Sequence, residues 1–147
     1  MTKECFKKIC VILACLTPLA CFADWARLGK DSSEITHYLD HGTLQRTGDM
    51  ARVLRLLDFE GGPPDIDEKM LFADEYFMSV LYYEEYDCKN RRHRILDATA
   101  YADRMMEGKI IEHIKTPSAW DNISPQTLLS QILSIVCQAT APRPTPQ

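Results

Sequence analysis

The six cysteines of this 147-residue chain are unevenly placed, and their positions constrain its fold more than any other sequence feature. Four of them lie within the first 21 residues, which leaves Cys88 and Cys137 as the only cysteines of the remaining chain. Taken alone, Cys88 could be a reactive thiol, a metal ligand or one half of a disulfide. The choice depends on whether the N-terminal segment belongs to the folded protein.

The N-terminal segment has the organisation of a secretory signal peptide. Lysines lie near its start, and residues 9–19 form an apolar run that is too short to span a bilayer. Cys21 and Ala23 are small residues at positions −3 and −1 of a cleavage point. We therefore predict that residues 1–23 are a signal peptide and that the chain is exported to the periplasm or the outer cell surface.

Cys21 also permits a second interpretation. Leu19-Ala20-Cys21 stands where a bacterial lipoprotein would carry its lipidated cysteine. The residue three positions before Cys21 is Pro18, although that site prefers leucine. Cleavage after Ala23 is therefore the preferred prediction, with a lipid anchor at Cys21 as the alternative.

Export leaves Cys88 and Cys137 in an oxidising compartment, where a pair of cysteines favours a disulfide. Residues 76–88 alternate as a strand that carries Cys88 on its more apolar face. A helix is predicted with Ser124 as its N-cap and Pro125 as its first residue, and Cys137 lies on the apolar stripe of this helix. The helix stripe consists of Leu129, Ile132, Leu133 and Val136. Both cysteines thus lie on core-facing surfaces, and we predict that they form one disulfide.

Three further strands are predicted in the first half of the chain. Residues 25–28 and 35–39 are short, aromatic and β-branched segments, and Asp40-His41-Gly42 is expected to end the second. Residues 50–59 alternate with one face more apolar than the other, before the Gly- and Pro-rich segment 60–65 ends the pattern.

Several motifs together resemble the surface-adhesin protein E-like domain of bacterial envelope proteins. They are Trp25, YLD at 38–40, YDCKNRRHRIL from Tyr86, EGKIIE from Glu107, SAWDNISPQTLL from Ser118 and IVC ending at Cys137. The likeness extends over nearly all of residues 24–138, and it departs at Gln126, where many relatives have glycine. It implies an α+β fold, in which a C-terminal helix packs on an antiparallel sheet of about six strands. It also implies binding to host matrix or serum proteins such as laminin and vitronectin.

Residues 91–103 carry two conflicting signals. The spacing of Ile95, Ala98 and Ala102 suits a helix, whereas the family resemblance implies a strand. We predict the strand, because an acidic strand ending at Asp87 followed by a basic one suits a hairpin with cross-strand charge pairs. The proline-rich segment 139–147 is predicted to be a disordered tail.

No catalytic or metal-binding pattern emerges from the titratable residues. His37 and His41 lie on an expected strand and its turn, and are interpreted as solvated. Glu84 and Glu85 are adjacent strand residues that face opposite sides, and are interpreted as surface charges. His93 has no residue to orient it toward Cys88 as a catalytic base. We predict a non-enzymatic protein without cofactor or metal, and its acidic net charge of −4 gives it no general attraction for nucleic acid.

A local basic patch is the remaining candidate for function. It comprises Lys89, Arg91, Arg92 and Arg94, and it resembles short heparin-binding runs. We predict that the patch contacts a matrix or serum protein or an acidic glycan, with Arg92 and Arg94 on one face and Arg91 grouped with His93 on the other. Two alternatives stay open: the patch could be a solvated strand paired to acidic neighbours, and the protein could be a periplasmic structural or envelope-assembly accessory.

Overall fold

The computed structural model describes residues 25–62 and 75–138. The predicted signal peptide, the lipidation alternative at Cys21 and the predicted disordered tail lie outside these residues, as do residues 63–74.

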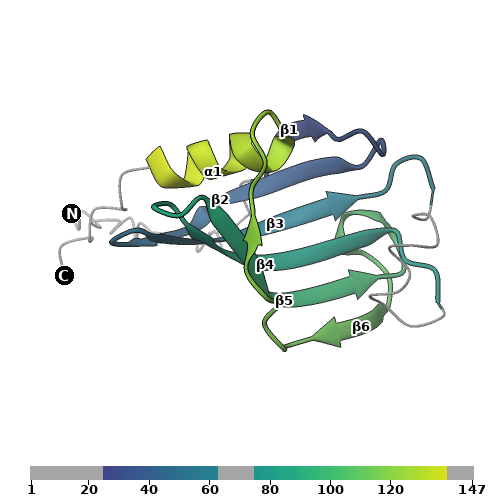
Figure 1. Ribbon diagram of the computed structural model, residues 1–147. Coiled ribbons are helices and arrows are strands. Elements are labelled where there is room, and N and C mark those ends of the chain that lie inside the picture. The colour runs from purple at the N-terminus through teal and green to yellow at the C-terminus, as the bar shows by residue number, and fades with distance from the viewer. Residues whose placement is uncertain (1–24, 63–74, 139–147) are drawn as a thin grey trace, which may run out of the picture.

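The described chain forms one antiparallel sheet with a single α-helix beside it (Figure 1). The strands are β1 (Trp25–Lys30), β2 (Thr36–Thr47), β3 (Met50–Asp58), β4 (Ser79–Asp87), β5 (Arg92–Tyr101), β6 (Ile110–Ile114) and β7 (Asp121–Asn122). The first six lie in sequence order across the sheet, and β7 pairs with β5. A short turn of 3-10 helix, η2 (Arg104–Met106), follows β5, and α1 (Leu128–Gln138) ends the fold. This architecture confirms the predicted α+β class.

The helix α1 lies across one face of the sheet, over the strands of the N-terminal half (Figure 1). Its predicted apolar stripe is confirmed, since Ile132, Leu133 and Val136 are buried and Leu129 packs beside them. They contact apolar residues of the sheet such as Val53. Burial of this stripe stabilises the helix, which is too short to be stable in isolation.

A second apolar cluster occupies the other half of the same sheet face. Register places Leu57 opposite Val80 and Val80 opposite Ala100, and all three are buried. Phe59 and Phe77 complete this cluster with an edge-to-face contact at 5.4 Å between ring centroids. The two clusters are separated along β3 by Arg55 and along β4 by Glu84.

The prediction that β2 ends at Asp40-His41-Gly42 is wrong. The strand continues to Thr47, because the register with β3 shifts between Asp40 and Gln45 and then resumes. An Asp40 carboxylate oxygen accepts a hydrogen bond from the Gly42 amide at 2.9 Å, so the turn-forming residues build a bulge within the strand. The hairpin comes at Gly48, whose φ of 60° suits glycine.

The predicted helix start at Ser124 and Pro125 is also wrong. The helix begins at Leu128, and the Thr127 hydroxyl accepts a hydrogen bond from the Ser130 amide at 3.1 Å, which makes Thr127 the N-cap. Gln126 causes the delay, since its φ of 61° is left-handed and cannot belong to the first helical turn. Glycine is the residue that adopts such a conformation without strain.

The segment that carried conflicting signals is a strand, as predicted. β5 pairs with β4 along its whole length, with one irregularity between Tyr83 and Glu84. Its alanines, Ala98 and Ala100, are buried in the second apolar cluster. Tertiary packing therefore outweighs the helix propensity of alanine in this segment.

Candidate functional site

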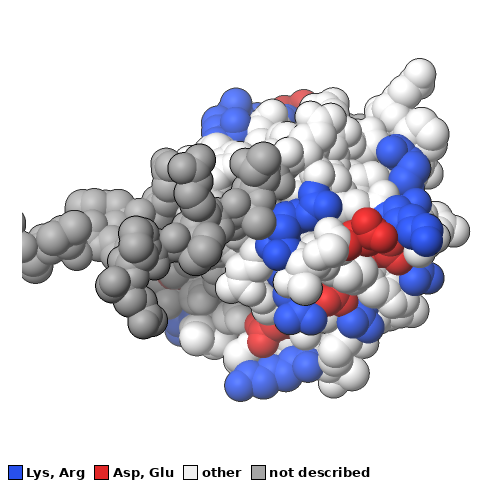
Figure 2. Space-filling view, turned by 90° about the vertical axis from the view of Figure 1, so that its left-hand side faces the viewer, with Lys and Arg blue, Asp and Glu red and all other residues white. Residues whose placement is uncertain are grey.

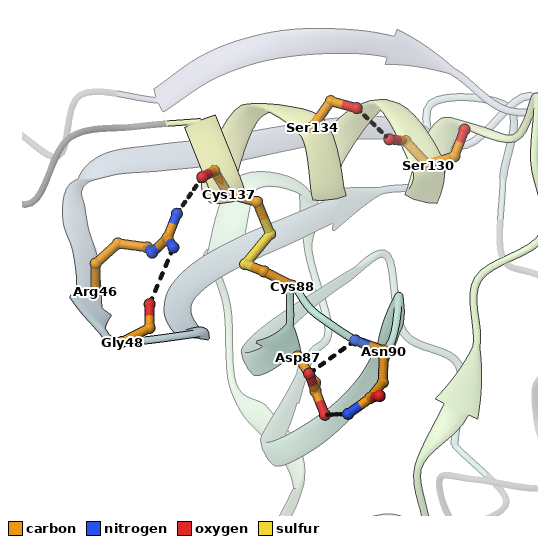
Figure 3. The surroundings of a disulfide bond; sticks show 8 residues. All are labelled: Arg46, Gly48, Asp87, Cys88, Asn90, Ser130, Ser134 and Cys137. Carbon is orange, nitrogen blue, oxygen red and sulfur yellow. Dashed lines mark hydrogen bonds between the residues drawn. A yellow bond between two sulfur atoms is a disulfide. The ribbon is translucent and has the colours of Figure 1, made fainter.

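Cys88 and Cys137 form a disulfide with their Cα atoms 5.7 Å apart (Figure 3). The bond joins the last turn of α1 to the turn that follows β4. Arg46 donates hydrogen bonds to the carbonyl oxygens of Cys137 and Gly48, so the β2–β3 hairpin also contacts this end of the helix. Cys88 is therefore a structural residue, and the predicted disulfide is part of the fold.

Glu84 is not the surface charge that its sequence context suggested. It is fully buried and forms a bidentate ion pair with Arg55, with distances of 2.6 Å and 2.9 Å from guanidinium nitrogens to carboxylate oxygens. The Tyr86 hydroxyl donates a further hydrogen bond to Glu84 at 2.5 Å. Burial alone would raise the pKa of Glu84, but Arg55 and the hydrogen bonds outweigh it and lower the pKa.

His37 is also buried, so its interpretation as a solvated side chain is wrong. One ring nitrogen lies 2.8 Å from the Arg55 guanidinium and the other lies 2.9 Å from the Asp31 carboxylate. Burial and the positive charge of Arg55 lower the pKa of His37, and Asp31 only partly opposes them. The side chains of Asp31, His37, Arg55, Glu84 and Tyr86 thus form one continuous network, in which Asp31 is partly exposed and the other four are buried.

His93 borders this network without joining it by a hydrogen bond. Its ring stacks on Tyr86 with centroids 5.8 Å apart, and its Nδ1 atom lies 3.8 Å from Glu84 and has no hydrogen-bond partner among the described residues. Burial lowers the pKa of His93, while Glu84 opposes and Arg55 adds to that shift.

The buried network is an ion pair with supporting side chains and has no arrangement suited to metal binding. No group of three or more histidine, cysteine, aspartate or glutamate side chains is placed to hold a metal ion within residues 25–62 and 75–138. Within the network Glu84 is paired to Arg55 and Asp31 to His37, and Arg55 also contacts His37, so the network joins β2, β3 and β4.

The structure divides the predicted basic patch into two parts. Lys89 and Arg91 are exposed in the turn between β4 and β5, where Arg91 has a left-handed φ of 50°. Arg92 and Arg94 lie on β5 and share one face, while His93 is buried on the other face. The predicted grouping of Arg92 with Arg94 agrees with this alternation, but Arg91 belongs to the turn and does not share the buried face of His93.

Arg92 and Arg94 pair with acidic residues of the neighbouring strand β4. Arg92 Nε lies 3.0 Å from Asp87, and Arg94 donates to Glu85 at 2.5 Å and 2.8 Å. Arg52 on β3 binds the other oxygen of Glu85 at 2.7 Å. Hydrogen bonds from Arg52 and Arg94 lower the pKa of Glu85 against the opposing effect of burial.

Sequence reasoning did not identify Trp120 as part of this site. The guanidinium carbons of Arg92 and Arg94 lie 4.8 Å and 4.5 Å from the centroid of its ring, which is a cation–π arrangement. Trp120 precedes β7, which pairs with β5 at Arg92 and His93. The only earlier signal was its place in the SAWDN motif, because the pairing of β7 cannot be seen in the sequence.

We call Arg52, Arg94 and Arg92 the arginine row. The carboxylates beneath the row are covered, since the side chains of Glu85 and Asp87 are 3% and 7% exposed. The three arginine side chains remain 31–49% exposed. Positive charge is therefore presented outward although each arginine is ion-paired.

The basic turn and the β2–β3 hairpin lie at the same end of the sheet, because Met50 pairs with Asp87. Figure 2 faces the end of the molecule at which this hairpin lies and shows Lys and Arg side chains interspersed with a few Asp and Glu side chains. The described residues that are visible on this face form no extended acidic surface. The two features together offer exposed cations on a rigid sheet.

The described residues contain no helix that is long and apolar enough to cross a membrane. The fold and the site define a small disulfide-linked α+β domain with an ion-paired, outward-facing cationic surface. The chain belongs to the surface-adhesin protein E family, whose model matches residues 25–138. A comparison with curated proteins found no match.

Solved structures of protein E from Haemophilus influenzae have the same fold. A selenomethionine form is 17% identical, with a TM-score of 0.57 over 77% of this chain and 84% of that one. A structure from a non-typeable strain is 16% identical, with a TM-score of 0.56 over 82% of this chain and 79% of that one. At this level of identity the likeness establishes the shared fold.

Proposed function

We propose that this chain is an exported, non-enzymatic binding protein of the bacterial cell envelope that acts as a surface adhesin for a host matrix or serum protein. The observation that carries the proposal is membership of the surface-adhesin protein E family over the whole described domain. The site supports it, since its titratable residues are engaged in ion pairs that stabilise the sheet, while its outer surface offers exposed cations.

The residues proposed to contact the partner are those of the basic patch. Lys89 and Arg91 are exposed in a turn at one end of the sheet, where a partner could approach without obstruction by the described chain. Arg92 and Arg94 extend the patch onto the sheet face. Such a surface attracts an acidic ligand most strongly at low salt, because the Debye length falls to about 8 Å at physiological ionic strength.

A second candidate is a periplasmic structural or assembly role without a host partner. The ion pairs of Arg92 and Arg94 favour it, because arginines that hold neighbouring strands together need no external ligand. The two candidates differ in where the protein resides.

Protease treatment of intact cells distinguishes the candidates. An adhesin is removed from the cell surface by added protease, whereas a periplasmic protein is degraded only after the outer membrane is permeabilised. Purified mature protein is tested in parallel on immobilised matrix and serum proteins. Full protection in intact cells, with a periplasmic control equally protected, would contradict the adhesin proposal.

The same preparation tests export. Mass spectrometry of the protein from its native compartment is expected to give an N-terminus at Asp24. A diacylated Cys21 would show that the chain is a lipoprotein, and an intact Met1 would show that the segment is retained.

A further inference from the structure

We propose that the arginine row is a preorganised binding site for a sulfated or carboxylated polysaccharide. The inference deepens the proposed function and rests on it in one respect, because an exported protein is placed where it can meet such a polysaccharide. It is carried by the arrangement of Arg52, Arg92 and Arg94 around covered carboxylates and Trp120.

First, at this surface the arginine side chains lie outside the carboxylates to which they are paired. In an ordinary exposed ion pair both partners face water and the net field is small. Here Glu85 and Asp87 are covered, and the arginine side chains above them keep 31–49% of their surface exposed. An approaching anion therefore meets guanidinium groups before it meets either carboxylate.

The second argument is that the guanidinium groups are already held in place. Asp87 fixes Arg92 through Nε, Glu85 fixes Arg94, and Trp120 contacts both groups through its ring. A free arginine side chain loses rotamer freedom when it binds a ligand, and this loss weakens the complex. The braced arginines of the row have already lost that freedom in the folded protein.

The third argument concerns the shape of the ligand. Arg52 on β3 and Arg94 on β5 lie on either side of Glu85 on β4, with their backbones about 10 Å apart, and the backbones of Arg92 and Arg94 are about 7 Å apart along β5. The basic turn with Lys89 and Arg91 continues the row at one end of the hairpin. Cations spaced along a sheet surface suit an extended polymer with repeated anionic groups.

An acidic polypeptide is the competing ligand class. A tight protein–protein contact centres on apolar anchors that insert into pockets. The ring of Trp120 beside the row already has two guanidinium groups against it. Arg94 gives Nε and one Nη atom to Glu85, but a guanidinium carries five N–H donors, and the remaining ones can bind an oxyanion without an apolar anchor. The row therefore favours the glycan.

The test uses the mature, disulfide-bonded protein and measures its affinity for heparin, hyaluronate and neutral dextran at several salt concentrations. We expect binding to heparin, hyaluronate or both, none to dextran, and affinity that falls as salt rises. Absence of binding to both acidic glycans at low salt would overturn the proposal. A poly-glutamate peptide that binds as tightly as the glycans would assign the row to an acidic polypeptide and overturn the glycan assignment.

Two variants separate a preorganised site from a general positive charge. Arg92→Lys/Arg94→Lys keeps the formal charge but removes the planar forks, and is expected to weaken glycan binding by about tenfold or more. Trp120→Leu removes the brace without changing charge, and is expected to weaken binding by a smaller factor. Unchanged affinity in both variants would show that only net charge matters and would overturn the proposal.

Arg27→Lys on β1 is the matched control, because Arg27 is exposed and lies on the far edge strand. It is expected to bind as the wild type does. Thermal unfolding of every variant shows whether the fold is retained. Protease protection in intact cells together with glycan binding by the row would refute the adhesin function while leaving the site intact, so the two proposals fail separately.

Discussion

Arg55 and Glu84 form an ion pair that is almost completely enclosed in the apolar interior, with side chains 6% and 0% exposed. Removing two charges from water is costly, and the bidentate geometry and the hydrogen bonds from Tyr86 and to His37 offset that cost. Burial opposes the charge on Arg55, but Glu84 outweighs burial and raises the pKa of Arg55. Both groups therefore remain charged at neutral pH.

Glu84→Gln is predicted to destabilise the protein strongly. It leaves the Arg55 charge buried without a counter-ion, which typically lowers the free energy of unfolding by about 3–5 kcal/mol. The double variant Arg55→Met/Glu84→Leu should cost less than Glu84→Gln alone, because it removes both charges. Urea unfolding measures the effect.

Glu34→Gln is the control for this prediction, since Glu34 is 75% exposed and its solvent-screened ion pair with Lys30 is expected to contribute little to stability. If Arg55→Met/Glu84→Leu were as unstable as Glu84→Gln, or less stable, this result would contradict a buried pair whose two charges compensate each other.

The buried histidines are predicted to make stability depend on pH. The pKa values of His37 and His93 are lowered below the usual value of about 6.5, so the folded state favours their neutral forms. The stability that the neutral histidines contribute is complete at pH values above their pKa in the unfolded state. It is lost as the pH falls through their lower pKa values in the folded state. The melting temperature should therefore fall as pH decreases from 7 to 5.

His93→Phe tests this dependence, because phenylalanine retains a ring beside Tyr86 but does not titrate. Its melting temperature should fall less steeply than that of the wild type over the same pH range. Parallel curves for the two proteins would show that His93 does not contribute.

At the scale of elements, the start of α1 depends on a single side chain. Thr127→Ala removes the hydrogen bond from the Ser130 amide and should lower the free energy of unfolding by about 1 kcal/mol. Ser124→Ala is the matched control and should change stability by less than about 0.5 kcal/mol. Chemical denaturation measures both, and equal losses would contradict the assignment of Thr127 as the N-cap.

The strand β5 and its charge pairs with β4 were predictable from the sequence, but its contact with Trp120 was not. Cross-strand charge pairs were expected from the acidic end of β4 and the basic start of β5, and Asp87–Arg92 and Glu85–Arg94 are such pairs. The pairing of β7 with the start of β5 brings Trp120 to Arg92 from outside the hairpin. This contact depends on register between segments far apart in sequence.

At the scale of the whole molecule, the disulfide joins a helix to a sheet that it covers only in part (Figure 1). The bond closes a loop of 49 residues, and the chain-entropy account assigns such a loop about 4 kcal/mol of stabilisation. The helix end is also held by Arg46, so the reduced protein retains a second contact there.

Cys88→Ser/Cys137→Ser is predicted to lower the free energy of unfolding by about 4 kcal/mol. Reduced wild-type protein should show a similar loss in urea unfolding, which serves as the control. The oxidised protein should have no thiol that reacts with a maleimide in denaturant. A double variant as stable as the oxidised wild type would show that the bond contributes nothing.

Features that depend on local pattern were predictable from the amino-acid sequence. Alternation along β3 and β4, the apolar stripe of α1 and the positions of two cysteines predicted these strands, the helix and the disulfide, whereas the α+β class was implied by the family resemblance. These signals are local because a strand or helix exposes its period in the residues that form it. They do not show what a side chain will meet on the opposite element.

Which charged side chains lie in the interior and which lie near the surface depends on contacts between distant parts of the chain. Glu84 and Glu85 are neighbours in sequence, yet one joins Arg55 in the interior and the other supports Arg52 and Arg94 at the surface. The difference arises because adjacent strand residues point to opposite faces, and only the position of α1 and the strand register determines which face is covered. A charged residue on a covered face is tolerated when a residue of another strand neutralises its charge. Which residue lies beside it depends on the pairing of strands that are far apart in the sequence.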